Sequence, residues 1–128
     1  MRALIVEDDE VSISILSSLL AEYFTCDVAR DGNEGWEKFL KASAGEPYDF
    51  IFLDIMMPHK DGQTLLNDIR NYESDKNLEK CKIIMTTALS DFDNVVKSFE
   101  YKCDDYIAKP IDKLKVKNIL ERNGYKKG

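Results

Sequence analysis

The chain has 128 residues, of which 44% are hydrophobic and 33% are charged, as in a soluble globular protein with one domain over residues 1–128. No apolar run approaches the roughly 20 residues of a membrane span, and the N-terminus lacks the layout of a signal peptide. We therefore expect a cytoplasmic protein without membrane insertion. The net charge of −6 disfavours sequence-blind binding to nucleic acid, so we expect no direct nucleic-acid contacts.

Five short apolar runs, taken in chain order, predict buried β-strands. They span residues 3–6, 26–29, 50–53, 83–85 and 106–108. Between and after them, apolar residues recur at helical spacing within residues 11–23, 36–40, 65–69, 95–99 and 111–120. This alternation predicts a parallel sheet with right-handed crossovers and helices on both faces.

Polar residues mark the expected ends of these elements. The aspartates expected to cap the second, third and fourth helices are Asp31, Asp61 and Asp91. Pro47 and the polar stretch of residues 73–80 predict loops. The cysteines number three and lack metal-like spacing, so we expect reduced thiols that serve packing only.

Charged and polar residues follow the predicted strands at the carboxyl edge of the sheet, where open parallel sheets bind ligands. They are Glu7, Asp8 and Asp9 after the first strand, Asp54 after the third, Thr87 after the fourth and Lys109 after the fifth. Carboxylates that converge without a counter-ion repel one another, so the cluster suits a hard cation, Mg²⁺ in a cell. The alternative is that Asp8 or Asp9 simply caps the first helix.

Lys109 is expected to be the only cation at this edge and to form a salt bridge with Asp54 in the resting state. A cis peptide bond to Pro110 could turn the lysine back over the sheet edge. The Thr87 hydroxyl can donate to an anionic oxygen, although a lone threonine at a strand end more often caps a turn. Together these groups form a minimal set for phosphoryl transfer onto Asp54.

The order and spacing of these residues resemble the response-regulator receiver domain of two-component signalling, along essentially the whole chain. The motifs that carry the resemblance are Ile5–Asp8, Leu53–Pro58 with Asp61–Gly62, Thr87–Ala88 and Asp105–Pro110. The resemblance implies an α/β fold of the flavodoxin-like, doubly wound (βα)5 type. Its three layers would enclose a parallel sheet with strand order 2-1-3-4-5.

The resemblance also implies the chemistry. Asp54 would be the phospho-acceptor, taking a phosphoryl group from a histidine kinase or a histidine phosphotransfer protein. The residues expected to hold Mg²⁺ are Asp8, Asp54, the backbone carbonyl of Met56 and, mainly through water, Glu7. Lys109 and Thr87 would balance the remaining charge. The protein would catalyse its own phosphorylation and dephosphorylation and would be a signalling protein, not an enzyme that acts on a separate substrate.

The output is expected to follow from Thr87 and Tyr106. After phosphorylation Thr87 would swing toward the phosphoryl group, and Tyr106 would rotate inward from solvent. The face formed by the fourth helix, fifth strand and fifth helix would then control a downstream target protein. The protein would be a monomer or a phosphorylation-dependent weak dimer. Because neither Met56 nor Leu89 can hold an attacking water, we expect slow self-dephosphorylation.

Two residues depart from the usual pattern of the family. Glu7 stands where many relatives have aspartate, and its longer side chain still offers oxygens for metal binding. Lys102 stands where relatives usually place glycine in the left-handed conformation, so we expect a strained residue or a different helix end.

A basic cluster closes the chain. Residues 109–128 hold seven Lys and Arg against two Asp and Glu, a local charge of +5 that leaves −11 for residues 1–108. A solvated helix face and a docking surface for an acidic partner both explain this cluster.

Other functions fit the sequence less well. A phosphorylation-independent pseudo-receiver that only docks to proteins is the main alternative. An aspartate-nucleophile phosphatase would need a second acid at the position of Met56. A flavin carrier would place its phosphate against Glu7 and Asp8.

Overall fold

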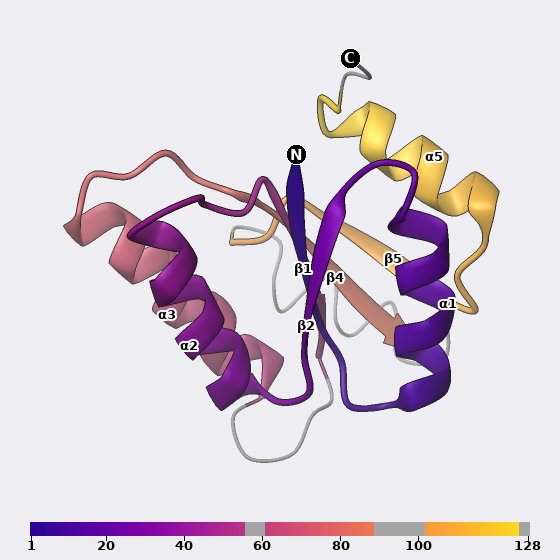
Figure 1. The fold of residues 1–128 in the computed structure, drawn as a ribbon, viewed down its shortest axis with the longest axis horizontal. Helices are drawn as coiled ribbons and strands as arrows, with labels where there is room; N and C mark the ends of the chain where they lie inside the picture. Colours follow the sequence, from indigo (N-terminus) through magenta and orange to yellow (C-terminus); the bar gives the residue numbers. More distant parts are fainter. Residues whose placement is uncertain (56–60, 89–101, 126–128) are drawn as a thin grey trace.

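The computed structural model describes residues 1–55, 61–88 and 102–125, which contain one sheet of five parallel strands. The strands are β1 (Arg2–Val6), β2 (Thr25–Ala29), β3 (Phe50–Asp54), β4 (Lys82–Ala88) and β5 (Asp105–Lys109). Their spatial order is β2-β1-β3-β4-β5 (Figure 1). The five predicted strands, the strand order and the flavodoxin-like fold are therefore confirmed.

Aspartates begin the described helices, which are α1 (Glu10–Leu20), α2 (Gly32–Ser43), α3 (Gly62–Asp75) and α5 (Lys113–Arg122). A carboxylate oxygen accepts the backbone N–H three residues further along the chain at each of the caps, Asp9, Asp31, Asp61 and Asp112. The predicted caps Asp31 and Asp61 are thus confirmed. The predicted fourth helix, with its cap at Asp91, lies outside the described residues.

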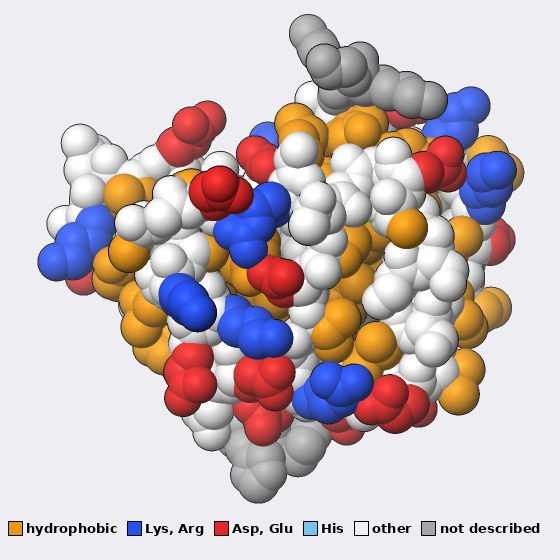
Figure 2. Space-filling view, in the orientation of Figure 1, with side chains coloured by type: hydrophobic (Ala, Val, Ile, Leu, Met, Phe, Trp, Pro, Cys, Tyr) orange, Lys and Arg blue, Asp and Glu red, His pale blue; other side chains and the backbone are white. Residues whose placement is uncertain are grey.

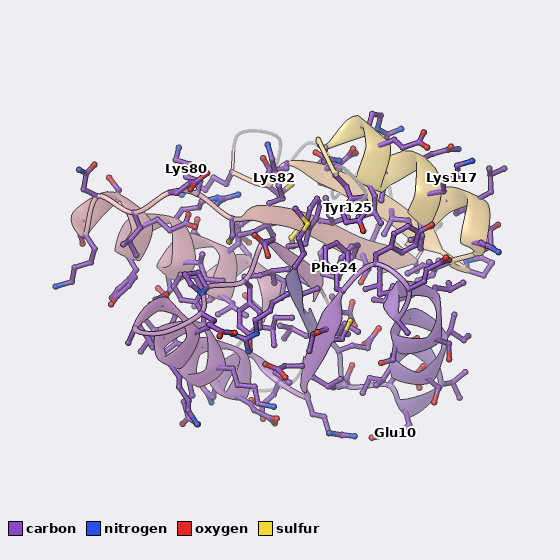
Figure 3. All side chains as sticks on the ribbon, turned by 45° about the horizontal axis from the view of Figure 1, so that its top comes forward. Glu10, Phe24, Lys80, Lys82, Lys117 and Tyr125 are labelled. Carbon is purple, nitrogen blue, oxygen red and sulfur yellow. The ribbon has the colours of Figure 1, made fainter. Side chains whose placement is uncertain are left out.

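The helices form one layer on each face of the sheet (Figure 1). α2 and α3 pack together on one face over a core that includes Ile51 and Leu66. α1 and α5 cover the other face over a core that includes Phe52. On that side the rings of Phe24 and Tyr125 lie 5.4 Å apart (Figure 3). β3 is buried along its whole length between the two layers. Its last residue, Asp54, is therefore a buried side chain at the carboxyl edge of the sheet.

Helical spacing correctly predicted α1, α2, α3 and α5, but it does not show which apolar side chains these helices bury. Val11 and Ile15 of α1 are 66% and 44% exposed, and Leu114 of α5 is 65% exposed. The residues that α1 buries are Ile13, Leu16 and Leu20. The sheet therefore contacts a face of α1 that is rotated from the one suggested by the first apolar residues of the helix.

The predicted loop at residues 73–80 begins too early, because α3 continues to Asp75. Glu73 is only 2% exposed, although its residue type suggested a solvated position. Its carboxylate accepts hydrogen bonds from Arg70 and from the backbone N–H of Cys81, each at 2.8 Å. These two donors compensate the carboxylate for the loss of water and allow the helix to bury it.

Lys102 does not strain the backbone. Among the described residues, the only one other than glycine with a positive φ is Asn77. Lys102 therefore avoids the left-handed conformation, and the expectation of a strained residue is wrong. The end of the predicted fourth helix lies outside the described residues.

The surface over α2 is charged, with Lys and Arg side chains next to Asp and Glu side chains (Figure 2). Within residues 1–55, 61–88 and 102–125, no helix is both long and apolar enough to cross a membrane. The three cysteines are free thiols.

Candidate functional site

Parallel strand register brings the predicted polar residues to one edge of the sheet. Val6 of β1 pairs with Leu53 of β3, so Glu7 and Asp54 follow side by side. Lys109 is the last residue of β5, two strands away from β3. The carboxyl ends of neighbouring strands thus supply both the acids and the cation.

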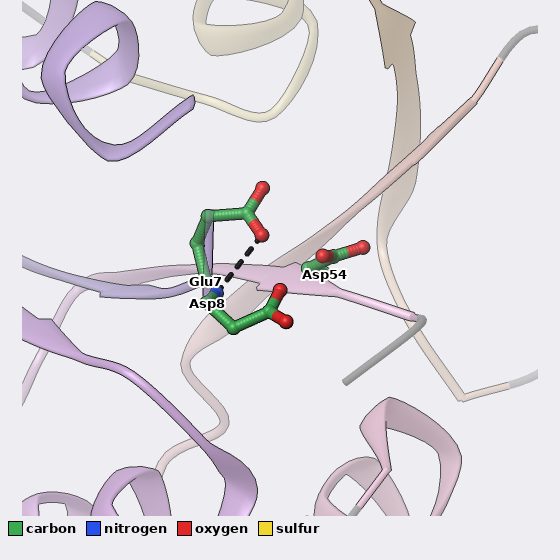
Figure 4. Close-up of side chains that lie close together, drawn as sticks. All are labelled: Glu7, Asp8 and Asp54. Atoms are coloured by element: carbon green, nitrogen blue, oxygen red, sulfur yellow. Dashed lines mark hydrogen bonds between the residues drawn. The ribbon is translucent and has the colours of Figure 1, made fainter. Parts of the chain in front are cut away.

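Glu7, Asp8 and Asp54 form a carboxylate cluster at this edge (Figure 4), with one oxygen of each within 4.8 Å of the others. Glu7 and Asp54 are 3% and 5% exposed, whereas Asp8 is open to solvent. The Asp8 N–H donates to Glu7 Oε2 at 3.0 Å. Asp9 instead caps α1, accepting the N–H and the hydroxyl of Ser12 at 3.0 and 2.8 Å. The capping alternative is therefore correct for Asp9, and Asp8 belongs to the cluster.

Lys109 provides positive charge inside the cluster. Its Nζ lies 2.5 Å from Glu7 Oε1 and 3.6 Å from Asp54 Oδ2. The expected ion pair with Asp54 is present, but Glu7 is the closer partner. The expectation of a single cation at this edge is wrong, because Arg30 directly follows β2 and its Nε donates to Glu10 at 2.8 Å.

The protonation equilibria of the cluster follow from burial and from Lys109. Burial opposes the charge of Glu7, but the interactions with Asp54 and Lys109 outweigh it and lower the Glu7 pKa. Burial also opposes the charge of Lys109. The hydrogen bond to Glu7 and the attraction of Asp54 outweigh burial, so the Lys109 pKa is raised. Burial and the neighbouring Glu7 raise the pKa of Asp8. Additional positive charge would therefore stabilise the ionised form of Asp8.

The donor atoms of the cluster suit a hard divalent cation. Glu7, Asp8 and Asp54 offer carboxylate oxygens, the ligands that Mg²⁺ prefers, and Asp8 leaves one side of the cluster open to water. Met56, whose carbonyl is a further expected ligand, and Leu89 lie outside the described residues.

Gly62 lies so close to the end of β3 that no side chain fits there, a role that its place at a predicted helix start did not indicate. A Cβ there would lie 2.6 Å from the carbonyl oxygen of Asp54 and 2.8 Å from the Cα of Ile55. The Gly62 N–H also donates to the Ile55 carbonyl at 3.2 Å. Glycine therefore allows α3 to begin directly against the backbone at the end of β3. The Asp61–Gly62 pair signalled a helix start, but nothing local indicated this close approach.

A family model described as the response regulator receiver domain matches residues 3–121. The chain belongs to this family. Hybrid signal transduction histidine kinase L of Dictyostelium discoideum is 36% identical over 125 residues, covering 96% of this chain and 7% of the relative. Regulatory protein VanRB of Enterococcus faecalis is 35% identical over 123 residues, covering 95% of this chain and 50% of the relative. The receiver domain thus spans half or less of the length of these relatives.

Solved receiver structures share the fold. The bacteriophytochrome response regulator RtBRR superposes with a TM-score of 0.83 at 22% identity, covering 99% of this chain and 80% of the other. The receiver domain of sensor histidine kinase PA1611 from Pseudomonas aeruginosa has a TM-score of 0.72 at 26% identity, covering 94% of both chains. That structure has a magnesium ion coordinated in its active site cleft.

Thr87 and Tyr106 lie on the neighbouring strands β4 and β5 of the receiver domain. Thr87 is 2% exposed, pairs with Ala108 and donates a long hydrogen bond of 3.4 Å to the Ala88 carbonyl. Tyr106 pairs with Met85, is half-buried and packs against the core on the α2 and α3 side. The two residues therefore lie on adjacent strands, two positions apart in register.

Proposed function

We propose that this receiver domain is a phospho-accepting response regulator whose phosphorylated residue is Asp54. The observation that carries the proposal is the setting of the Asp54 carboxylate. It lies at the carboxyl end of β3, 5% exposed, beside two other carboxylates and 3.6 Å from the Lys109 ammonium. A nucleophile and a cation for an incoming anion are thereby combined where this fold binds ligands.

The proposed reaction moves a phosphoryl group from a phosphohistidine on a histidine kinase or a histidine phosphotransfer protein. An oxygen of Asp54 attacks the phosphorus, a P–O bond forms, and the P–N bond breaks with its electron pair leaving on the imidazole. Lys109 pairs with one oxygen of the transferred group, and the Thr87 hydroxyl donates to another. Hydrolysis of the aspartyl phosphate would later restore the carboxylate.

We assign Mg²⁺ binding to Glu7, Asp8 and Asp54, with the carbonyl of Met56 as the further ligand expected from the family. When bound, the ion supplies positive charge to the attacking and transferred oxygens. The fit of the three carboxylates and the magnesium in the PA1611 receiver domain support this assignment.

The donor protein is proposed to dock on the exposed apolar part of α1. Val11 and Ile15 are the large apolar residues exposed there. Next to them lies a cavity of about 350 Å³, lined by Ser12, Ile15, Ala88, Lys109, Pro110 and Ile111. Because Lys109 belongs both to this cavity and to the acceptor site, a protein bound there would bring its phosphohistidine close to Asp54.

The downstream target is proposed to read the face that includes β5 and α5. Lys115 is engaged within the domain, donating to the carbonyls of Ala108 and Pro110 at 3.1 and 2.8 Å. Lys113 and Lys117 are exposed and form no hydrogen bond or ion pair with the residues that the structure describes. Lys117 lies on the outer side of α5 (Figure 3). These two cations favour an acidic partner over a purely solvated face.

Intact-mass measurement tests the proposal. Incubation with Mg²⁺ and a small phosphodonor should add one phosphoryl group to the wild type and none to Asp54→Asn. Asp75→Asn, an exposed acid in α3, is the matched control and should gain the group normally. A wild type that never gains the mass would support the pseudo-receiver, and equal gain by Asp54→Asn would place the acceptor elsewhere.

A further inference from the structure

An ion-pair network centred on the largely buried Arg70 side chain joins α3 to the residues before β5, at the sheet edge opposite Asp54. Arg70 bonds to Glu73 through Nη1 at 2.8 Å, to Asp104 through Nη2 at 2.9 Å and to the Lys102 carbonyl through Nε at 2.7 Å. The side chains of Arg70 and Glu73 are 12% and 2% exposed. We call the bonds from Arg70 to Lys102 and Asp104 the Arg70 staple.

Other bonds fix the same short segment of residues 102–104. Asp104 Oδ2 also accepts the N–H of Ile83 at 2.8 Å, and the Asp104 N–H donates to the Ile83 carbonyl at 2.8 Å. Lys102 Nζ donates to Asn67 of α3 at 2.6 Å. The segment is therefore attached both to β4 and to α3 before the chain enters β5.

β5 is consequently anchored at both ends, with Tyr106 between the anchors. The Arg70 staple holds its start. Arg122 also holds it, because Nε and Nη2 of Arg122 each donate to the Asp105 carboxylate at 2.9 Å. Lys109 holds its end in the carboxylate cluster. Tyr106 and Cys103 pack against the same core. Burial raises the pKa of the Cys103 thiol, and a hydrogen bond from Tyr106 partly offsets this rise. The switch residue thus contacts the segment that the staple holds.

Phosphorylation of Asp54 would change the charges around only one end of β5, at Lys109. The ladder with β4 fixes the register of β5, and the Arg70 staple adds a fixed point before the strand. Without that point, movement of residues 102–105 could absorb part of the change, and less of it would reach Tyr106. With the start fixed, the change is confined to the stretch that contains Tyr106. We propose that Arg70 is a positioning residue of the switch, which holds the start of β5 so that phosphorylation is transmitted to Tyr106. This inference rests on the proposed function.

Fluorine NMR of protein labelled with 3-fluorotyrosine tests the inference, with the Tyr106 signal assigned through Tyr106→Phe. Wild type treated with Mg²⁺ and a small phosphodonor should show a displaced Tyr106 signal. In Arg70→Met the displacement should fall at least twofold at the same phosphoryl mass. A displacement as large as in the wild type would overturn the proposal.

Two further variants separate positioning from general stability. Arg2→Met removes an arginine that bonds to Asp27 and to the Glu46 carbonyl far from β5, and it should keep the full displacement. Asp104→Asn leaves Glu73 paired with Arg70 and should reduce the displacement even if Arg70→Met fails to fold. An equal loss in Arg2→Met would also overturn the proposal. Wild type that gains the phosphoryl mass without moving the Tyr106 signal would refute the switch itself, and wild type that gains no mass would refute the proposed function.

Discussion

Neutralising Asp8 should stabilise the metal-free domain. One oxygen of Asp8 lies within 4.8 Å of oxygens of Glu7 and Asp54, and burial and the neighbouring Glu7 raise the Asp8 pKa. Two unit charges at this separation repel by about 0.9 kcal/mol in bulk water. Lys109 offsets part of this repulsion, so we expect Asp8→Asn to gain roughly 0.5–1 kcal/mol. For a domain of this size the gain corresponds to a rise in Tm of about 2–4 °C.

The same substitution should remove the response to Mg²⁺. At ten times its Kd, a ligand bound at one site adds about 1.4 kcal/mol to the free energy of unfolding, which raises Tm by about 5 °C. Thermal melts in EDTA and across a Mg²⁺ titration measure both effects, with Asp75→Asn as the control. The reasoning is refuted if Asp8→Asn melts below the wild type in EDTA, or if it keeps the full rise with Mg²⁺.

Three other substitutions test contacts around the site and in β2. Gly62→Ala places a Cβ 2.6 Å from the Asp54 carbonyl oxygen. It should therefore lower the free energy of unfolding, measured in urea, by about 1–3 kcal/mol and slow phosphorylation. An unchanged free energy and an unchanged phosphorylation rate would contradict this. Ile15→Asp should slow transfer from a protein donor roughly tenfold and leave the rate with a small phosphodonor unchanged, whereas equal losses with both donors would argue against docking on α1. A hydrogen bond from Tyr48 lowers the pKa of Asp27, so the stability it contributes is present at pH 7 and is lost as the pH falls below about 4. The urea midpoints of wild type and Asp27→Asn should therefore converge on acidification, and a constant difference would exclude this contribution.

The sequence was sufficient to predict the strands and the place of the site. A run such as Phe50–Leu53 has few alternatives to a buried strand, and parallel pairing then puts the ends of neighbouring strands at one edge. Asp54 and Lys109 could be placed together for this reason, without any knowledge of side-chain positions.

Features that depend on three-dimensional partners could not be predicted in the same way. Periodicity identifies α1 as a helix, but its rotation depends on the sheet it contacts, and this leaves Val11 exposed. Glu73 is buried because Arg70, one helical turn before it, and the distant amide of Cys81 meet its carboxylate. The local sequence shows one of these partners and not the other.

The position of the Lys109 ammonium, closer to Glu7 than to Asp54, bears directly on the proposed chemistry. Its Nζ lies 2.5 Å from Glu7 and 3.6 Å from Asp54, while the backbone N–H groups of Asp8 and Asp9 hold the other Glu7 oxygen at 3.0 and 3.4 Å. A carboxylate in a tight ion pair is a weaker nucleophile, because its charge is already neutralised. By holding Lys109, Glu7 leaves Asp54 more of its charge for attack. The ammonium nevertheless stays near enough to pair with the oxygens that a transferred phosphoryl group would bring.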